Sequence, residues 1–348
     1  MTHRMLNRRT AIQGMGALAA ALAVPEGASA APAWRKPPRL RPGDVVGLVE
    51  PAGFTADAFD LDAVKASIVA MGLVPKPAPH LLSRYGYLAG KDRERAADLN
   101  AMYADKDVRA VFAVRGGWGS ARILPYLDWK TIRANPKLLI GFSDITALHL
   151  AFAQRAGFAT IHGPNAGSSW GELSWESFRT LAFEGGTPTY AYPQAKEDRL
   201  APREGRTRTF RAGKASGPLL GGNLTVLTAL AGTPYLPDFA GAILFLEDTD
   251  EAEYRIDRML TQLALSGVLR RVAGVVFGQC TNCRASAPSF GGFTLSEVLQ
   301  QHLEPLGVPA FQGAYFGHIP NQYSLPVGAR AEIDAMAGTI RILEPAVA

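Results

Sequence analysis

Cysteine is scarce in this chain of 348 residues, which contains only two, Cys280 and Cys283, in the stretch GQCTNC. No second C-x-x-C motif and no nearby pair of histidines accompanies them, so the four ligands of a structural zinc site are not available. Two interpretations of the pair stay open. In an oxidising compartment the two could close into a small disulfide. Otherwise they are half-buried thiols that follow the apolar run VAGVVFG.

Long apolar runs and dense clusters of one charge are also missing. Beyond the first thirty residues no apolar run is long enough to span a bilayer, so we expect no stable membrane insertion. No stripe of basic residues interleaved with aromatics occurs, and the net charge is only +5, which argues against a nucleic-acid partner. The hydrophobic fraction of 47% and the charged fraction of 19% are typical of globular proteins.

The first thirty residues contain the three regions of an export signal in order. MTHRMLNRRT is basic and includes the twin arginines Arg8 and Arg9, and AIQGMGALAAALAV is moderately apolar. Ala28-Ser29-Ala30 has the small-x-small pattern that signal peptidase accepts. A twin-arginine signal is read by a receptor that exports folded proteins. We therefore predict that residues 1–30 are a signal peptide and that the mature protein works in the periplasm.

The rest of the chain is long enough for two domains. In residues 34–167, apolar runs that end in turns alternate with segments of helical spacing. The apolar runs begin near 44, 109, 137 and 159, and the helical patterns cover 60–72, 91–108 and 144–157. This alternation predicts an α/β domain with a parallel sheet and helices on both faces. The functional turns of such a sheet lie at the carboxyl ends of its strands.

The second half of the chain has a different pattern. Residues 168–211 are rich in glycine, proline, threonine and charge without clear periodicity, so we interpret them as a linker with room for one hairpin. Residues 212–348 are predicted to form a smaller C-terminal α/β domain with a mixed sheet. Its apolar runs at 241–248 and 272–279 indicate strands, and helices are expected from about Glu253 and at 294–307.

Ser143 stands in GFSDIT, where an apolar run hands over to a helical pattern. A serine on such a turn exposes its oxygen, and the N–H of the next residue, Asp144, points toward bound substrate, as in a nucleophile elbow. The sequence is not G-x-S-x-G, however. Either side chain could instead cap the helix, and spacing alone favours the cap.

The glycine-rich turn VRGGWGSAR, residues 114–122, is the second chemically suggestive stretch. Adjacent glycines after a strand leave backbone N–H groups uncovered, which can form a nest for an anion or an oxyanion. The spacing of a phosphate-binding loop is absent. Arg115 could hold a substrate carboxylate or pair with an acid.

A nucleophilic serine needs a histidine base, which in turn needs an orienting carboxylate. His162 follows a predicted strand and His318 sits at a glycine-flanked turn, so both are candidates, whereas His149 lies on the far side of the helix that follows Ser143. Glu247 directly follows a buried run, at the carboxyl end of a predicted strand. The other acids after it look like a solvated turn. They have neither EF-hand spacing nor a histidine, so we expect no metal and no cofactor.

Several stretches together resemble the LD-carboxypeptidase family of serine peptidases, in order from about Arg41 to Ile342. They are VRGGWGSARILPYLD, LIGFSDITALHLA, HGPN, GPLLGGNLTVLTALAGTPYLPDFAGAILFLEDTDEAEYRIDRMLTQL and FGHIPNQYSLPVGARAEID. The family includes murein tetrapeptide carboxypeptidases and the microcin C self-immunity peptidase. The resemblance implies a catalytic triad of Ser143, Glu247 and His318, which displaces the cap interpretation. It also implies an oxyanion hole formed by the N–H groups of Asp144 and Gly117.

The resemblance further implies a substrate. The expected substrate is the peptidoglycan stem tetrapeptide or a muropeptide, from which cleavage of an L,D bond releases the terminal D-Ala through an acyl-enzyme. Trp118 stands where relatives often carry tyrosine, so substrate contacts near Arg115 and Trp118 are expected to differ. Relatives also suggest a homodimer. Two alternatives remain: a peptidase of the microcin C self-immunity type that acts on peptidyl-nucleotides, and a non-catalytic murein-binding protein.

Overall fold

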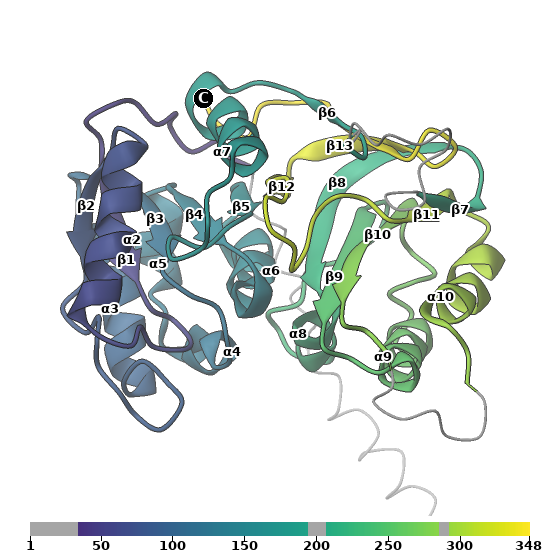
Figure 1. Cartoon of the computed structure of the whole chain (residues 1–348), viewed down its shortest axis with the longest axis horizontal. Coiled ribbons are helices and arrows are strands. Elements are labelled where there is room, and N and C mark those ends of the chain that lie inside the picture. The colour runs from purple at the N-terminus through teal and green to yellow at the C-terminus, as the bar shows by residue number, and fades with distance from the viewer. Residues whose placement is uncertain (1–33, 194–206, 285–291) are drawn as a thin grey trace, which may run out of the picture. The chain divides into compact units, whose positions relative to one another are not determined.

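The computed structural model describes residues 34–193, 207–284 and 292–348, which form two sheets with helices packed around them (Figure 1). The predicted signal peptide, residues 1–30, and part of the predicted linker, residues 194–206, lie outside the described residues. No helix in the described part of the chain is both long and apolar enough to cross a membrane.

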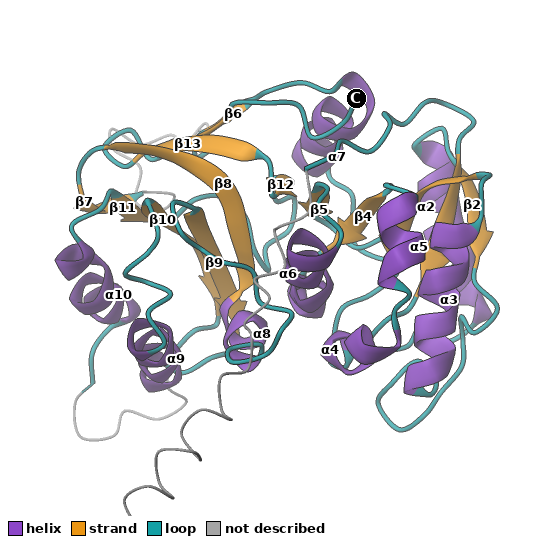
Figure 2. Cartoon of the chain, turned by 180° about the vertical axis from the view of Figure 1, so that it is seen from behind, coloured by secondary structure: helices purple, strands orange, loops and turns teal. Residues whose placement is uncertain are grey.

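The first sheet has six strands in the order β12-β5-β4-β3-β1-β2. The strands are β1 (Val45–Val49), β2 (Val74–Pro77), β3 (Val108–Ala113), β4 (Leu138–Gly141), β5 (Thr160–His162) and β12 (Leu325–Val327). Strands β1 to β5 run parallel, as the alternation of strands and helices predicts, and β12 pairs antiparallel with β5. The inner strands are buried almost throughout because helices flank the sheet (Figure 2).

Between residues 34 and 157 the described chain forms five α-helices. They are α2 (Ala58–Ala70), α3 (Asp92–Ala104), α4 (Ser120–Ile123), α5 (Trp129–Ala134) and α6 (Thr146–Arg155). The predicted helices at 60–72 and 91–108 correspond to α2 and α3. Asp57 caps α2, because its carboxylate accepts hydrogen bonds from the N–H groups of Phe59 and Asp60.

The second sheet has eight strands in the order β6-β14-β13-β8-β9-β10-β11-β7. The strands are β6 (Thr189–Tyr190), β7 (Arg208–Arg211), β8 (Lys214–Asn223), β9 (Ile243–Thr249), β10 (Gly274–Thr281), β11 (Ala310–Gln312), β13 (Arg330–Asp334) and β14 (Thr339–Ile342). Strands β8 to β11 are parallel and both ends of the sheet are antiparallel, so it is the mixed sheet that was predicted. Its helices are α8 (Leu224–Ala229), α9 (Glu253–Leu265) and α10 (Leu295–Leu303).

The interpretation of residues 168–211 as a linker with a hairpin is wrong for its described part. Helix α7 (Glu172–Arg179) and a π-helical turn (Thr180–Glu184) lie within it. β6 pairs with β14 and β7 with β11, so the two strands form no hairpin. The helix is too short to show a clear helical periodicity in the sequence. The burial of Phe178, and of Leu181 in the turn that follows, stabilises it.

Strand β12 is a second departure from the sequence analysis, because it comes from the predicted C-terminal region yet completes the first sheet. Leu325 of β12 lies opposite His162 of β5. The tail therefore crosses from the second sheet to the first just after His318. This crossing brings a late segment of the chain to the carboxyl ends of the first sheet's strands.

Candidate active site

Ser143 sits on the tight turn between β4 and α6. Its φ of +65° lies in the left-handed region, which is uncommon for a residue other than glycine. The turn runs from Gly141 through Phe142 into a single 3₁₀ turn, Ser143–Ile145. Neither N-cap residue, Phe142 for this turn or Ile145 for α6, makes a side-chain capping hydrogen bond. The helix-cap interpretation that spacing favoured is therefore wrong for Ser143 and for Asp144.

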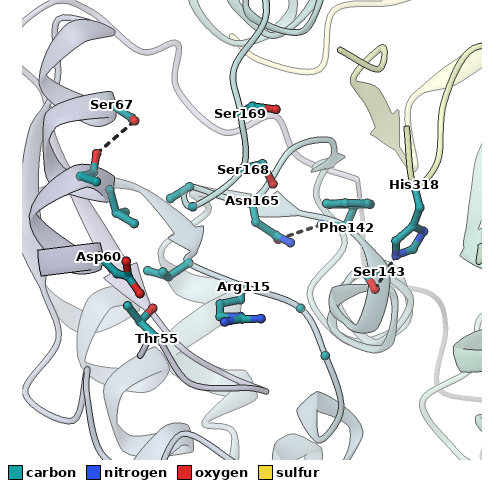
Figure 3. A pocket seen from close by; sticks show the side chains of 17 residues that line it. Thr55, Asp60, Ser67, Arg115, Phe142, Ser143, Asn165, Ser168, Ser169 and His318 are labelled. Atoms are coloured by element: carbon teal, nitrogen blue, oxygen red, sulfur yellow. Dashed lines mark hydrogen bonds between the residues drawn. The ribbon is translucent and has the colours of Figure 1, made fainter. Parts of the chain in front are cut away.

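Ser143, His318 and Glu247 form one chain of hydrogen bonds. The Ser143 Oγ lies 2.9 Å from Nε2 of His318 (Figure 3). Nδ1 of the same ring lies 2.6 Å from Oε2 of Glu247. Glu247 is fully buried near the carboxyl end of β9. Gly317, with a φ of +117°, lets the loop pass close to this carboxylate, since a Cβ there would lie 3.0 Å from the Glu247 Cβ.

Backbone and side-chain bonds from the end of β10 fix the His318 loop. The Thr281 hydroxyl donates to the His318 carbonyl at 2.6 Å, and the Gln279 N–H donates to the Phe316 carbonyl at 2.9 Å. Cys280 and Cys283 are joined by a disulfide around Thr281, which settles the two interpretations left open by the sequence.

The charges around His318 favour its protonated form. Burial acts against the imidazolium, but the hydrogen bond and negative charge of Glu247, with the charges of Asp248 and Asp250, outweigh it and raise the pKa of His318 above its ordinary value. The pKa of Asp248 rises to about 6, mainly because the carboxyl is buried and secondarily because Glu247 is negative.

Asp248, which was expected to lie in a solvated turn, is instead a buried neighbour of Glu247. It is 2% exposed. Its carboxylate accepts hydrogen bonds from the Asn223 amide at 3.0 Å and from both the N–H and the hydroxyl of Thr225. Asp248 therefore holds the start of α8 beside Glu247. Only the strand register, which pairs Asn223 with Glu247, reveals this contact.

The glycine turn packs directly against the serine. A Cβ on Gly116 would lie 2.9 Å from the Cβ of Ser143, and Gly117 adopts a φ of +110°. Both features require glycine. The turn and Asp144 are also linked, because the Ser120 N–H donates to the Asp144 carboxylate at 2.7 Å. Burial raises the pKa of that carboxyl.

A cavity of about 720 Å³ opens beside Ser143 and His318. Its described lining residues are Thr55, Asp60, Ala63, Val64, Ser67, Val114, Arg115, Gly116, Gly117, Phe142, Ser143, Asn165, Ala166, Gly167, Ser168, Ser169 and His318. Figure 3 places Asp60 and Thr55 across the cavity from Ser143, with Arg115 between them and the serine. Arg115 donates one N–H to the Phe54 carbonyl at 3.2 Å. Trp118, which is 48% exposed, does not line this cavity, and its contact with substrate stays a prediction.

The other candidate base, His162, does not reach Ser143. It is fully buried, neither ring nitrogen has a partner within the described residues, and burial holds its pKa far below the ordinary value. His149 is also buried and bonds the Thr160 hydroxyl and the Gly141 carbonyl, each at 2.8 Å. Among the described residues no group of three or more His, Cys, Asp or Glu side chains is arranged to hold a metal ion.

Comparison with known proteins identifies the family. The sequence model of the LD-carboxypeptidase N-terminal domain matches residues 46–163, and that of the LD-carboxypeptidase C-terminal domain matches residues 216–333. A probable murein peptide carboxypeptidase of Bacillus subtilis (strain 168) is 37% identical over 87% of this chain and 93% of its own. The murein tetrapeptide carboxypeptidase of Pseudomonas aeruginosa (strain PAO1) is 31% identical over 83% and 92%.

A solved structure agrees with these matches. The microcin C7 self-immunity protein, in a mutant form with adenosine monophosphate bound, superposes with a TM-score of 0.80 at 25% identity and covers 90% of this chain and 100% of its own. The two sequence models together span most of the chain, and the relatives match nearly their whole length. The chain therefore belongs to the LD-carboxypeptidase family of peptidases.

Proposed function

We propose that this peptidase is a serine carboxypeptidase that cleaves the L,D bond before the terminal D-Ala of peptidoglycan stem tetrapeptides. The unbroken chain of hydrogen bonds from Ser143 through His318 to the buried Glu247 carries the proposal. A hydroxyl activated by an imidazole that a carboxylate orients is the arrangement used in acyl transfer. The names of the murein peptide carboxypeptidases among its relatives support the substrate class.

The proposed reaction proceeds through an acyl-enzyme. His318 accepts the Ser143 proton at Nε2 while Oγ attacks the scissile carbonyl, and Glu247 stabilises the resulting imidazolium. The N–H groups of Asp144 and Gly117 hold the oxyanion. The imidazolium then protonates the departing amine of D-Ala. A water molecule gives its proton to His318, attacks the ester carbonyl and releases the shortened peptide with Ser143 restored.

The cavity suits an exopeptidase. A carboxypeptidase must recognise the free carboxylate at the end of its substrate, and Arg115 is a cation on the cavity wall next to the glycine turn. We assign Arg115 to this carboxylate. Polar groups of Thr55, Ser168 and Asn165 leave further hydrogen-bonding positions for a peptide.

The second candidate is a peptidase of the microcin C self-immunity type, which the structural match with the self-immunity protein favours. Its substrate would be a peptidyl-nucleotide or a related acylated amino-acid compound. The same hydrogen-bonded chain would perform the chemistry, and only the groups that fill the cavity would differ.

The test of the function is release of D-Ala. We expect the purified protein to convert murein tetrapeptide to tripeptide and D-Ala, detected by mass spectrometry, and Ser143→Ala to reduce turnover by at least about 10⁴-fold without changing the thermal unfolding curve. His162→Ala is the matched histidine control and should retain substantial activity. Turnover of a peptidyl-nucleotide without D-Ala release would replace the first candidate by the second. Loss of all activity in His162→Ala would mean that the base is misassigned.

We further propose that the protein is exported through its twin-arginine signal. The disulfide between Cys280 and Cys283 supports an oxidising compartment, since such bonds are rare where glutathione keeps thiols reduced. The expected substrate, intact murein or released muropeptides, is found in the periplasm.

A further inference from the structure

Arg95 is a fully buried arginine in helix α3, close to the glycine turn. It is 1% exposed, and arginine is almost never buried this deeply without partners. Its guanidinium donates to the Gly119 carbonyl at 2.9 Å, to the Pro51 carbonyl and to the Asp92 carboxylate at 2.5 Å. The two carbonyls belong to different loops. Pro51 is 44 residues and Gly119 is 24 residues from Arg95 along the chain.

The loop after β1, which Arg95 binds through Pro51, also contacts the glycines beside Ser143. The loop after β1 contains Pro51 and Gly53, and the Gly53 N–H donates to the Gly116 carbonyl at 3.1 Å. A Cβ on Gly117 would lie 3.5 Å from the Gly53 Cα. The guanidinium therefore ties the glycine turn, which contains Gly117, to the loop after β1.

Asp144 holds the other end of the same turn. The Ser120 N–H donates to the Asp144 carboxylate at 2.7 Å, and the Ser120 hydroxyl donates to the Asp144 carbonyl. Gly119 and Ser120 are consecutive, so Arg95 binds the first residue of one short segment and Asp144 binds the second. This segment joins the two residues whose N–H groups form the oxyanion hole in the proposed function.

We infer that Arg95 is a positioning residue that keeps the Gly117 amide in register with the Asp144 amide for the oxyanion. The inference rests on the proposed function. Lysine cannot replace the guanidinium, because its single ammonium cannot bridge two carbonyls and a carboxylate in a planar fork. Loss of one oxyanion donor lowers kcat by about 10²–10³-fold, and displacement of a donor has a similar consequence.

Arg122 provides a matched control. It binds the same Asp92 carboxylate, through the other oxygen at 3.0 Å, but its side chain is 41% exposed. Among the described residues its side chain donates only to Asp92, with no hydrogen bond to Gly119, Ser120 or the Pro51 loop. Arg122→Met and Arg95→Met thus remove the same kind of contact to Asp92, whereas only the second releases the loops.

The experiment measures two rates on each variant. One is steady-state release of D-Ala, with kcat and KM separated. The other is covalent labelling of Ser143 by a fluorophosphonate, followed by mass spectrometry. For Arg95→Met we expect both kcat and the labelling rate to fall by about 30-fold or more while KM changes less than about threefold. Arg95→Lys should lie between Arg95→Met and wild type, and Arg122→Met should stay within about twofold of wild type.

Ser120→Ala keeps the test decisive if the Arg95 variants fail to fold. It removes the hydroxyl bond to Asp144 but retains the backbone bond, and we expect about a tenfold fall in kcat and in labelling. If the Arg95 variants fold and keep wild-type rates, the inference is overturned. If they do not fold, wild-type rates in Ser120→Ala overturn it. Wild-type protein that is labelled but releases no D-Ala would overturn the substrate while the labelling rates still decide the role of Arg95. Wild-type protein that is not labelled would overturn both proposals.

Discussion

Ser143, the proposed nucleophile, has an unfavourable backbone conformation. A non-glycine residue in the left-handed region is strained by about 1–3 kcal/mol and remains there only where its surroundings fix it. The buried strand β4 before it and helix α6 after it provide that constraint, and Gly116 leaves room for its side chain. The turn directs the hydroxyl to His318 and away from the start of α6, which is why the cap interpretation failed.

The charges near His318 make a prediction about pH. In the proposed reaction His318 must be neutral to accept the Ser143 proton, and its pKa is raised by Glu247, Asp248 and Asp250 against the effect of burial. Activity should therefore fall as the pH is lowered through a pKa above the ordinary histidine value of about 6.5. Removing one charge with Asp250→Asn should lower that pKa, so that the acidic limb of kcat/KM moves to lower pH by a few tenths of a unit, roughly.

The substitution suits the site, because asparagine tolerates the φ of +55° at Asp250 and can still accept the hydrogen bond from Asn282. The measurement is kcat/KM for D-Ala release between about pH 5 and pH 9. Asp238→Asn, at an exposed carboxylate paired with Arg271, is the control and should leave the limb in place. A limb that moves to higher pH in Asp250→Asn would contradict the charge arrangement.

Helix α7, which lies within the predicted linker, is hydrogen-bonded to the loop that carries His318. The Asn321 side-chain oxygen accepts the Ser174 N–H at 2.9 Å, a bond that Gly171, the residue at the helix start, has no side chain to make. The Ser174 hydroxyl donates to the Gln322 carbonyl at 2.8 Å. Asn321 thus acts as a helix cap from a distant part of the chain, three residues after His318.

Substitutions at Asn321 test this cap. Asn321→Asp keeps an acceptor and adds a charge that suits a helix N-terminus, so its melting temperature should equal or exceed that of wild type. Asn321→Gly tolerates the φ of +61° but removes the acceptor, and should cost about 1 kcal/mol. Asn321→Ala loses both advantages and should unfold at the lowest temperature of the three. Thermal unfolding followed by circular dichroism gives the order, and a Gly variant as stable as the Asp variant would refute the cap.

The sequence predicted those elements whose signals are local. Ser143 and Glu247 each follow an apolar run and His318 follows a glycine in a turn, and the resemblance then selected His318 over His162. Arg95 was not found, because it lies in the charged stretch KDRERAADL, where nothing local shows that two distant carbonyls surround it. The short strands expected in the C-terminal tail include β12, but its place beside β5 was not predicted, because the sequence of a three-residue strand does not show which strand it pairs with.

Across the whole molecule, the separation of Ser143 from His318 depends on how the two sheets meet. The Thr146 hydroxyl, at the start of α6, accepts the Asn223 N–H from the end of β8 at 2.9 Å. Asn223 is the register partner of Glu247 on β9. The helix that follows the serine therefore touches the strand next to the carboxylate, and this contact sets the distance between the two halves of the hydrogen-bonded chain.

Gly222 is the closest point of that contact and gives the sharpest test. A Cβ there would lie 2.4 Å from the Thr146 hydroxyl, and the glycine has a φ of +137°. Gly222→Ala must push α6 away from β8, so we expect a loss of stability of about 2–4 kcal/mol together with a fall in kcat of about tenfold or more.

Gly232→Ala is the control, because that glycine also has a positive φ, of +82°, but open space where the Cβ would be. It should cost about 1–2 kcal/mol of backbone strain and leave kcat unchanged. Since both variants carry the strain and only one disturbs the contact between sheets, equal kcat values in the two would show that the Ser143 to His318 distance is set elsewhere.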